Sequence, residues 1–321
     1  MSKQLKVLAV LAGLVLCPLI IHAQGVGSKP VRLLVPAPAG GPTDFAARLV
    51  APRLSEALGQ NVVVDNRGSA NGVVGAELAA RAAPDGLTLI MGNSGTHAIN
   101  AGLYRKLPYD PQRDFVPITQ VLSSGMVLVA NPRLPAGSLK EFIALAKKDS
   151  GKLNIGVAGA TGQLAGEALK AQTQIALNNV HYKGSAPTEF AVLQGEVEVT
   201  LLTPIASAAH VNAGKLKALG VTSAKRMTLL PNVPTIAESG VDGYDFEIWH
   251  GLFAPAGTQD RIVRILHQET VRILDVPEVR ERVGAQGFYI VANTPEQFAA
   301  LVKREIAKYR KIITEAGIAL E

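Results

Sequence analysis

Short apolar runs alternate with helix-like segments along most of this chain of 321 residues. The first run, residues 31–35, is typical of a strand that is buried on both faces. Prolines and glycines interrupt the pattern over residues 36–42, and Thr43 or Asp44 can then cap a helix that extends to about Leu58. The start of this region therefore predicts a strand, a tight loop and a helix.

The alternation continues towards the C-terminus. A capping box, formed by Ser138 and Glu141, predicts the start of one later helix. Further apolar runs predict strands at residues 61–65, 88–91, 126–130, 153–157, 197–202, 216–221 and 252–254. Helical patterns predict helices at residues 72–82, 139–149, 163–171, 258–274 and 295–316.

This order of elements predicts two α/β lobes, each a mostly parallel sheet flanked by helices. Strands that alternate with helices pair in parallel through right-handed crossovers. The chain is too long for one ordinary core, and its aromatic content of 5% favours layered α/β packing over a β-sandwich. Ligands of such sheets bind at the carboxyl ends of strands, which directs attention to residues 36–44, 92–96 and 156–162.

The charge pattern argues against a nucleic-acid partner. The net charge is +6, and a basic balance can indicate an anionic surface as a partner. The basic residues are scattered among acidic ones, however, and no basic stripe with interleaved aromatic residues is present. We interpret the charge as an ordinary solvated surface.

Residues 1–23 have the composition of an export signal. Lys3 and Lys6 precede an apolar stretch at residues 7–21, and Ala23 supplies a small residue at a suitable cleavage point. The stretch is short for a membrane span, and no stop-transfer pattern follows it; a buried N-terminal helix is the alternative. We therefore expect a periplasmic protein with a cleaved signal peptide.

The single cysteine, Cys17, lies inside this segment. It is a candidate for lipid attachment, but the bulky Leu16 stands where a lipoprotein signal needs a small residue. Cleavage would leave a mature chain with no disulfide, no thiol nucleophile and no thiolate metal site.

The loop at residues 36–44 is the strongest candidate for a binding site. Its prolines stiffen the backbone and remove donors, whereas Gly40 and Gly41 allow a ligand to approach closely. The helix that follows offers unpaired N–H groups and a partial positive charge, which together can hold an anion without an arginine. The alternative is an ordinary strand-to-helix connection.

Two further loops follow predicted strands. Residues 92–96 present hydroxyls in a turn, but Thr96 stands where the hydrolase pattern G-x-S-x-G needs a glycine. We interpret this loop as a source of hydroxyl donors for a ligand, with a simple turn as the alternative. Residues 156–162 match neither glycine-rich nucleotide pattern, and no lysine follows to meet a phosphate.

The histidines and Trp249 favour packing over chemistry. The six histidines form no H-E-x-x-H motif and no recognisable pairing with a carboxylate, so we expect no metal and no cofactor. Ser94 with His97 is the best candidate for a nucleophile and its base, yet their spacing is not one of a recognisable triad. We therefore expect a protein that is not an enzyme. Trp249 is expected to pack in the core or between the lobes, with direct contact to a ligand as the alternative.

Several segments together resemble the periplasmic receptors of the tripartite tricarboxylate transporter system, the Bug family. The matching segments follow one another along nearly the whole mature chain, at residues 29–36, 40–44, 58–67, 84–86, 107–111, 182–184, 213–216, 231–235 and 249–257. The resemblance implies a two-lobed, flytrap-like periplasmic binding protein of type II. One lobe would comprise residues 24–123 and 247–321, and the other residues 124–246.

The resemblance also implies a site for the carboxylate of a ligand. In the family this group is held by the loop that matches residues 36–44, partly through bound waters, and two further loops add donors. Carried over position by position, the expected ligand-binding residues are Ala37, Pro38, Ala39, Gly40, Gly41, Thr43, Asp44, Ser94, Thr96, Gly159, Ala160, Thr161, Gly162 and Thr203.

Two departures from the family pattern affect the expected ligand. Gln163 stands where family members often carry a histidine, after a shorter loop. Thr203 stands where an aspartate often pairs with the ammonium group of an amino-acid ligand. Burial of an ammonium group without a countercharge is unfavourable, so we expect a non-amino organic acid.

The expected function is capture of a small carboxylate for the membrane permease subunits of a tripartite tricarboxylate-type transporter. Closure of the two lobes around the ligand would create the surface that the permease recognises. A sensory or orphan receptor is the alternative among binding proteins. An exported hydrolase is the alternative of a different class.

Overall fold

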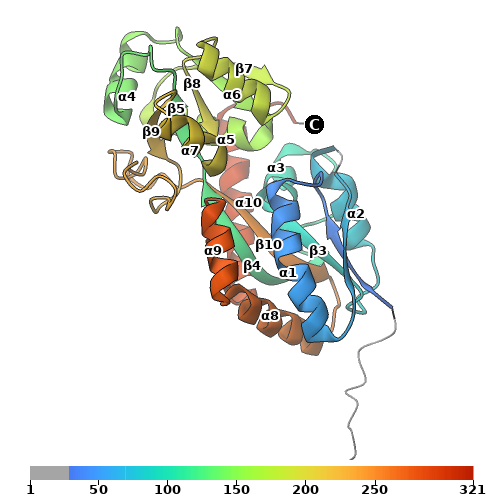
Figure 1. Cartoon of the computed structure of the whole chain (residues 1–321). Helices are drawn as coiled ribbons and strands as arrows, with labels where there is room; N and C mark the ends of the chain where they lie inside the picture. Colours follow the sequence, from blue (N-terminus) through green and yellow to red (C-terminus); the bar gives the residue numbers. More distant parts are fainter. Residues whose placement is uncertain (1–28, 69, 321) are drawn as a thin grey trace, which may run out of the picture.

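Two β-sheets, each with helices packed against it, form the body of the molecule (Figure 1). The computed structural model describes residues 29–68 and 70–320. The predicted signal peptide and Cys17 therefore lie outside the described residues. Within residues 29–68 and 70–320, no helix has the length and apolar character needed to cross a membrane.

The first lobe is the six-stranded sheet, in the order β11-β4-β10-β3-β1-β2, with its helices. Its N-terminal elements are β1 (Val31–Val35), α1 (Pro42–Leu58), β2 (Val62–Asn66), η1 (Ala70–Gly72), α2 (Val73–Ala80), β3 (Thr88–Asn93), η2 (Gly95–Ile99), α3 (Asn100–Leu103) and β4 (Phe115–Gly125). Its C-terminal elements are β10 (Glu247–Pro255), α8 (Asp260–Leu274), α9 (Pro277–Ala285), β11 (Tyr289–Ile290) and α10 (Pro295–Glu315).

The second lobe is the five-stranded sheet, in the order β7-β6-β8-β5-β9, with its helices. Its elements are β5 (Val127–Ala130), α4 (Leu139–Lys148), β6 (Asn154–Ala158), α5 (Gly159–Thr173), β7 (Asn178–Tyr182), α6 (Ser185–Gln194), β8 (Val199–Leu202), α7 (Pro204–Asn212) and β9 (Lys217–Val221). The apolar runs of β5 and β8 are buried along their whole length, which is why they lie inside the sheet.

The α/β class is confirmed, and both sheets are mixed where the sequence favours mostly parallel ones. The strands β1, β2 and β3 pair in parallel, as do β6, β7 and β8. By contrast, β10 is antiparallel to β3 and β4, and β5 is antiparallel to β8 and β9. β4 carries the chain out of the first sheet and β10 carries it back along the same path, so these two strands run in opposite directions. The short strand β11 is also antiparallel to β4.

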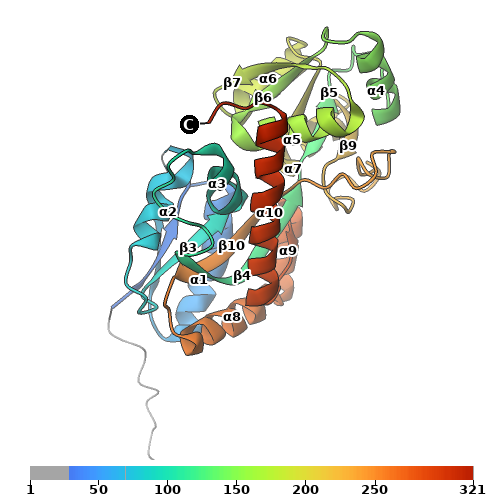
Figure 2. The same cartoon turned by 180° about the vertical axis from the view of Figure 1, so that it is seen from behind.

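The connection between the lobes is a long antiparallel pair. β4 and β10 pair from Gly125 opposite Glu247 to Phe115 opposite Pro255. The long helix α10 runs beside them and reaches α5 of the second lobe (Figure 2). Just before β10, the Tyr244 hydroxyl donates a hydrogen bond to the carbonyl oxygen of Ala165 in α5, at 2.9 Å. The chain that leads from the second lobe back to the first therefore bonds to α5 before β10 and to β4 along β10.

Trp249 is a packing residue, as the sequence favours. Only 1% of its surface is exposed, and its ring meets Phe298 edge-on at 5.5 Å between centroids. The capping box predicted at Ser138 is half formed: its hydroxyl accepts the Glu141 N–H at 3.2 Å. The Glu141 carboxylate reaches one residue further and accepts the N–H of Gly137.

Candidate functional site

The loop between β1 and α1 is shaped by the side chain of Asp44. Gly40 has a φ of 83°, and its N–H donates to Asp44 Oδ2 at 2.9 Å. Arg48 Nε donates to the same oxygen at 2.9 Å, and Asn66 Nδ2 donates to Asp44 Oδ1 at 3.0 Å. Burial favours a higher pKa for Asp44, but the hydrogen bonds from Arg48, Gly40 and Asn66 outweigh it and hold the pKa below its ordinary value. The carboxylate is therefore ionised and fully partnered.

Backbone donors remain free at the start of α1. The N–H groups of Gly41, Thr43 and Asp44 have no hydrogen-bond partner among the described residues. Gly41 precedes the first turn of α1 and Pro42 begins it, so the donors lie at the positive end of the helix dipole. The loop before them, at residues 38–40, is exposed. This is the arrangement that binds anions at helix N-termini.

The second predicted loop is joined to the first by Asn93, at the end of β3. Asn93 Nδ2 donates to Thr43 Oγ1 at 3.1 Å, and Asn93 Oδ1 accepts the N–H of Thr96 at 3.0 Å. The N–H of Thr96 is thereby occupied, whereas the hydroxyl of Ser94 makes no hydrogen bond to another described residue. Ser94 begins η2, a single π-helical turn, and such turns are frequent at functional sites.

Two buried histidines contact the threonine hydroxyls of these loops. His250 Nδ1 is 3.3 Å from Thr43 Oγ1, and His97 Nδ1 is 2.9 Å from Thr96 Oγ1. Burial lowers the pKa of His97 to about 3 and that of His250 to about 4. Both imidazoles are therefore neutral near pH 7, and they contribute no charge to the site.

Ser94 and His97 do not have the nucleophile–base geometry that the hydrolase alternative needs. His97 Nδ1 is directed to Thr96 rather than Ser94, and His97 Nε2 is buried without a partner among the described residues. Ser94 therefore has no general base within the hydrogen bonds of the described chain. The described residues also contain no group of histidine, cysteine and acidic side chains able to hold a metal ion.

The predicted residues of the second lobe begin two helices. Gly159 opens α5 with a φ of 66° and is exposed, and the N–H groups of Ala160 and Thr161 have no partner among the described residues. Gly162 is buried within the first turns of α5. Thr203 precedes α7, is half-buried, and makes no side-chain hydrogen bond to another described residue.

Contacts between the lobes bring the second set of residues towards the first. Helix α5 packs beside η2 of the first lobe. Pro204, next to Thr203, lies against Gly287 of the first lobe, so closely that a Cβ added to Gly287 would come within 2.4 Å of it. The fold thus joins the loops at residues 36–44 and 92–96 directly, and places those at residues 159–162 and Thr203 on the other side of the interlobe contact.

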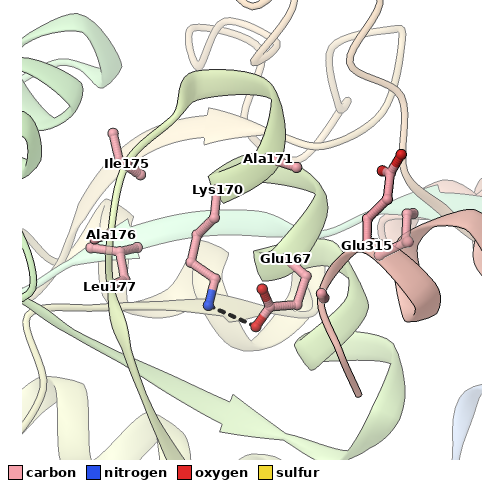
Figure 3. Close-up of a pocket in the computed structure, with 9 residues that line it drawn as sticks. Glu167, Lys170, Ala171, Ile175, Ala176, Leu177 and Glu315 are labelled. Atoms are coloured by element: carbon pink, nitrogen blue, oxygen red, sulfur yellow. Dashed lines mark ion pairs between the residues drawn. The ribbon is translucent and has the colours of Figure 1, made fainter.

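A hollow in the surface lies between the second lobe and the end of α10. It measures about 400 Å³ and is lined by the second half of α5, the segment before β7, and the end of α10 (Figure 3). Lys170 and Glu167 form an ion pair of 2.7 Å within it. None of the predicted ligand-binding residues lines this hollow, so it does not define the candidate site.

Two residues of the site were not selected from the sequence. Asn93 ends β3 beside Ser94 and Thr96, and the strand-end rule that selected those hydroxyls applies equally to its amide. His250 lies opposite Asn93 in the antiparallel pairing of β10 with β3. No local signal indicates that pairing, because the two residues are far apart in the sequence.

Two α/β lobes joined by the crossing strands β4 and β10 define the class of two-lobed solute-binding proteins. The comparison with known families agrees. The model of the tripartite tricarboxylate transporter family receptor matches residues 46–318, and this chain belongs to that family. Members are substrate-binding receptors rather than enzymes, which confirms the expectation from the sequence.

Curated relatives cover nearly the whole chain. The protein BugT of Bordetella pertussis is 34% identical over 304 residues, which are 94% of this chain and 93% of BugT. A protein encoded in the TAR-I ttuE-ttuC' intergenic region of Agrobacterium vitis is also 34% identical, over 97% of this chain and 91% of its own length. The resemblance to the Bug family is thus confirmed.

Solved structures share the fold. The structure of R. palustris Rpa4515 with adipate is 36% identical, has a TM-score of 0.79, and covers 92% of this chain and 99% of its own. That of MatC from Rhodopseudomonas palustris with bound malate is 32% identical, has a TM-score of 0.75, and covers 89% of this chain and 99% of its own. Both are similar proteins whose structures contain a small dicarboxylate.

Proposed function

We propose that this protein is a periplasmic solute-binding protein, which captures a small carboxylate and presents it to the membrane permease subunits of a tripartite tricarboxylate-type transporter. Family membership supports the type of transporter. The adipate and malate in two similar structures support the chemical class of the ligand. The observation that carries the proposal is the set of free N–H donors at the start of α1, beside the hydroxyl of Thr43.

These donors suit a carboxylate for electrostatic reasons. Hydrogen bonds to a charged acceptor contribute about 1.5–3 kcal/mol each, and the helix dipole adds up to about 2 kcal/mol in a partly buried site. A few such contacts reach about −8 kcal/mol, which corresponds to micromolar binding. The charge of Arg48 is already paired with Asp44, so the site would hold its anion by dipoles rather than by a formal positive charge.

The second lobe would complete the site on closure. We propose that residues 124–246 move against residues 24–123 and 247–321, with the crossing strands β4 and β10 as the hinge. The start of α5, at residues 159–162, and Thr203 would then reach the ligand. Export through cleavage after residue 23 would deliver this protein to the periplasm.

The ligand we propose is a non-amino organic acid. Thr203 is half-buried and offers a hydroxyl, whereas the ammonium group of an amino acid would need a countercharge on burial. A dicarboxylate can instead place its second carboxylate against the free N–H groups at the start of α5. This assigns one helix N-terminus of each lobe to one end of the ligand.

Thermal unfolding of the mature protein with a panel of acids tests the proposal. Ligand at 100 times its Kd stabilises the folded state by about 2.7 kcal/mol, so we expect adipate or malate to raise the melting temperature. The uncharged diamide of adipate is the matched control and should have no effect. Stabilisation by the amino acids glutamate or aspartate, with no effect of adipate or malate, would contradict the proposed ligand class.

A further inference from the structure

A continuous row of polar side chains joins the two loops of the first lobe. Asn93 is its centre, because its amide bonds to both Thr43 and Thr96. A histidine stands at each end: His250 Nδ1 faces Thr43 Oγ1 at 3.3 Å, and His97 Nδ1 faces Thr96 Oγ1 at 2.9 Å. We call this row, His97–Thr96–Asn93–Thr43–His250, the polar relay.

Both histidine rings are enclosed by apolar groups. His97 is 0% exposed and stacks on Phe253 at 4.1 Å, and His250 is 2% exposed and meets Phe288 edge-on at 5.8 Å. In each ring, Nε2 has no hydrogen-bond partner among the described residues. Among the described residues, the hydrogen-bond partner of each ring is therefore the threonine oxygen at Nδ1.

The position of the ring hydrogen follows from this asymmetry. A neutral imidazole carries one hydrogen, either on Nδ1 or on Nε2, and the hydrogen-bond network decides which. A buried N–H that lacks an acceptor is destabilising and rare, whereas an acceptor that lacks a donor is tolerated more often. Since each Nε2 is buried without a partner, the hydrogen belongs on Nδ1, from which it donates to the threonine.

We infer that His97 and His250 are positioning residues of the ligand site, which act through Thr96 and Thr43; the inference rests on the proposed capture of a carboxylate. His250 and Asn93 both donate to Thr43 Oγ1 and so fill its two acceptor positions. The hydroxyl hydrogen of Thr43 is then left to donate. With its own free N–H, Thr43 presents two donors and no acceptor to the ligand.

Within the polar relay, Thr96 fixes the position of Asn93. Its Oγ1 accepts from the Asn93 backbone N–H at 3.2 Å and from His97, and its own O–H lies 3.3 Å from the Asn93 carbonyl oxygen. The backbone N–H of Thr96 donates to Asn93 Oδ1 at 3.0 Å, and this bond orients the Asn93 amide so that its Nδ2 is directed to Thr43. The site therefore selects an ionised carboxylate oxygen, because an amide or a protonated acid would bring a donor that finds no acceptor there.

Nitrogen-15 NMR of the ligand-free wild-type protein tests the ring hydrogens directly. We expect the hydrogen on Nδ1 in both His97 and His250, with neither ring titrating between about pH 5 and pH 8. A hydrogen on Nε2 of His250, or titration of either ring in this range, overturns the inference. The measurement needs no ligand, so its outcome is separate from that of the proposed function.

Binding measurements test the consequence for Thr43, with adipate and malate as the probes. His250→Asn places an amide donor near the position of Nδ1, whereas His250→Gln places it nearer Nε2. We expect the asparagine variant to retain binding and the glutamine variant to weaken it about tenfold, which is about 1.4 kcal/mol. In a Thr43→Val background, His250→Gln should cause no further loss.

His181→Asn is the matched control, because His181 is an exposed histidine on β7. Its affinity for both probes should equal that of the wild type. Equal losses from the two His250 variants, or an additional loss from His250→Gln beside Thr43→Val, would show that His250 does not act through the hydroxyl of Thr43.

Discussion

At the start of α1, Asp44 shapes the loop, whereas its neighbours keep donors free for a ligand. Asp44 places a negative charge beside a site proposed for an anion, but its oxygens are occupied by Gly40, Arg48 and Asn66. The adjacent N–H groups and the Thr43 hydroxyl then remain available to a ligand. Asp44 thus sets the loop geometry, and Arg48 offsets its charge.

Asp44→Asn should destabilise the loop, since three donors lose an ionised acceptor. We expect a loss of about 1–3 kcal/mol in the free energy of unfolding, measured by urea denaturation near pH 7. Glu269→Gln is the control, because its pair with Arg272 is on the surface of α8 and such pairs contribute under about 1 kcal/mol. Equal losses from the two variants would contradict the role of Asp44.

The lowered pKa of Asp44 predicts how its contribution to stability changes with pH. The pKa of Asp44 lies below its ordinary value of 3.8, so its contribution is present above that pH and is lost as the pH falls through the lower, folded-state pKa. The difference in stability between wild type and Asp44→Asn should therefore shrink below about pH 4. Urea denaturation of both proteins across this range measures it, and a difference that grows on acidification would be inconsistent with an ionised, partnered Asp44.

At the scale of elements, β10 belongs to both the candidate site and the proposed hinge. His250 lies in its middle, opposite Asn93, and Glu247 begins it, opposite the last residue of β4. Burial raises the pKa of Glu247, although hydrogen bonds from Ser123 and Tyr289 oppose the rise. At the end of β10 nearest the second lobe, this carboxylate is therefore one whose ionised form is disfavoured by burial.

Glu247→Gln should stabilise the protein at neutral pH. Because the folded-state pKa is raised above 4.5, the contribution of the protonated acid is fully present below that pH and is lost as the pH rises through the folded-state value. We expect the variant to melt on the order of 2 °C higher than wild type at pH 7, with the gain vanishing near pH 4. Glu281→Gln, at an exposed position of α9, is the control; a gain largest in acid would refute the assignment.

At the scale of the whole molecule, the two lobes are in close contact at Gly287. Gly287 has a φ of 76°, and a Cβ there would come within 2.4 Å of Pro204 and 2.9 Å of Leu229. Both of these residues belong to the chain between β5 and β10, whereas Gly287 lies between α9 and β11. The absence of a side chain at this position therefore permits the observed approach of the lobes.

Gly287→Ala should push the lobes apart and lower stability. The left-handed backbone alone costs about 1–2 kcal/mol with a Cβ, and the contact with Pro204 adds to it. We expect a lower melting temperature and a larger radius of gyration in small-angle X-ray scattering. Gly284→Ala is the matched control, since nothing lies within 4 Å of its added Cβ; identical scattering from the two variants would contradict the steric account.

The sequence by itself determined the local elements and the loops of the candidate site. The apolar run before Pro36 and the glycines and proline before Thr43 predict a strand, a loop and a helix, and all three are present. Such features depend on residues within a few positions of one another. The same holds for α10, whose predicted start at Pro295 is fixed by a capping box between Thr294 and Gln297.

Only the tertiary structure decided how distant segments meet. The strand β4 carries serines, threonine and proline among its apolar residues, so its sequence pattern does not predict a strand. Its pairing with β10 joins residues more than a hundred positions apart. That pairing makes the sheets mixed and brings His250 opposite Asn93. Local pattern sets which side chains can be buried, but the partner of a buried polar atom depends on long-range register, which no short stretch of sequence contains.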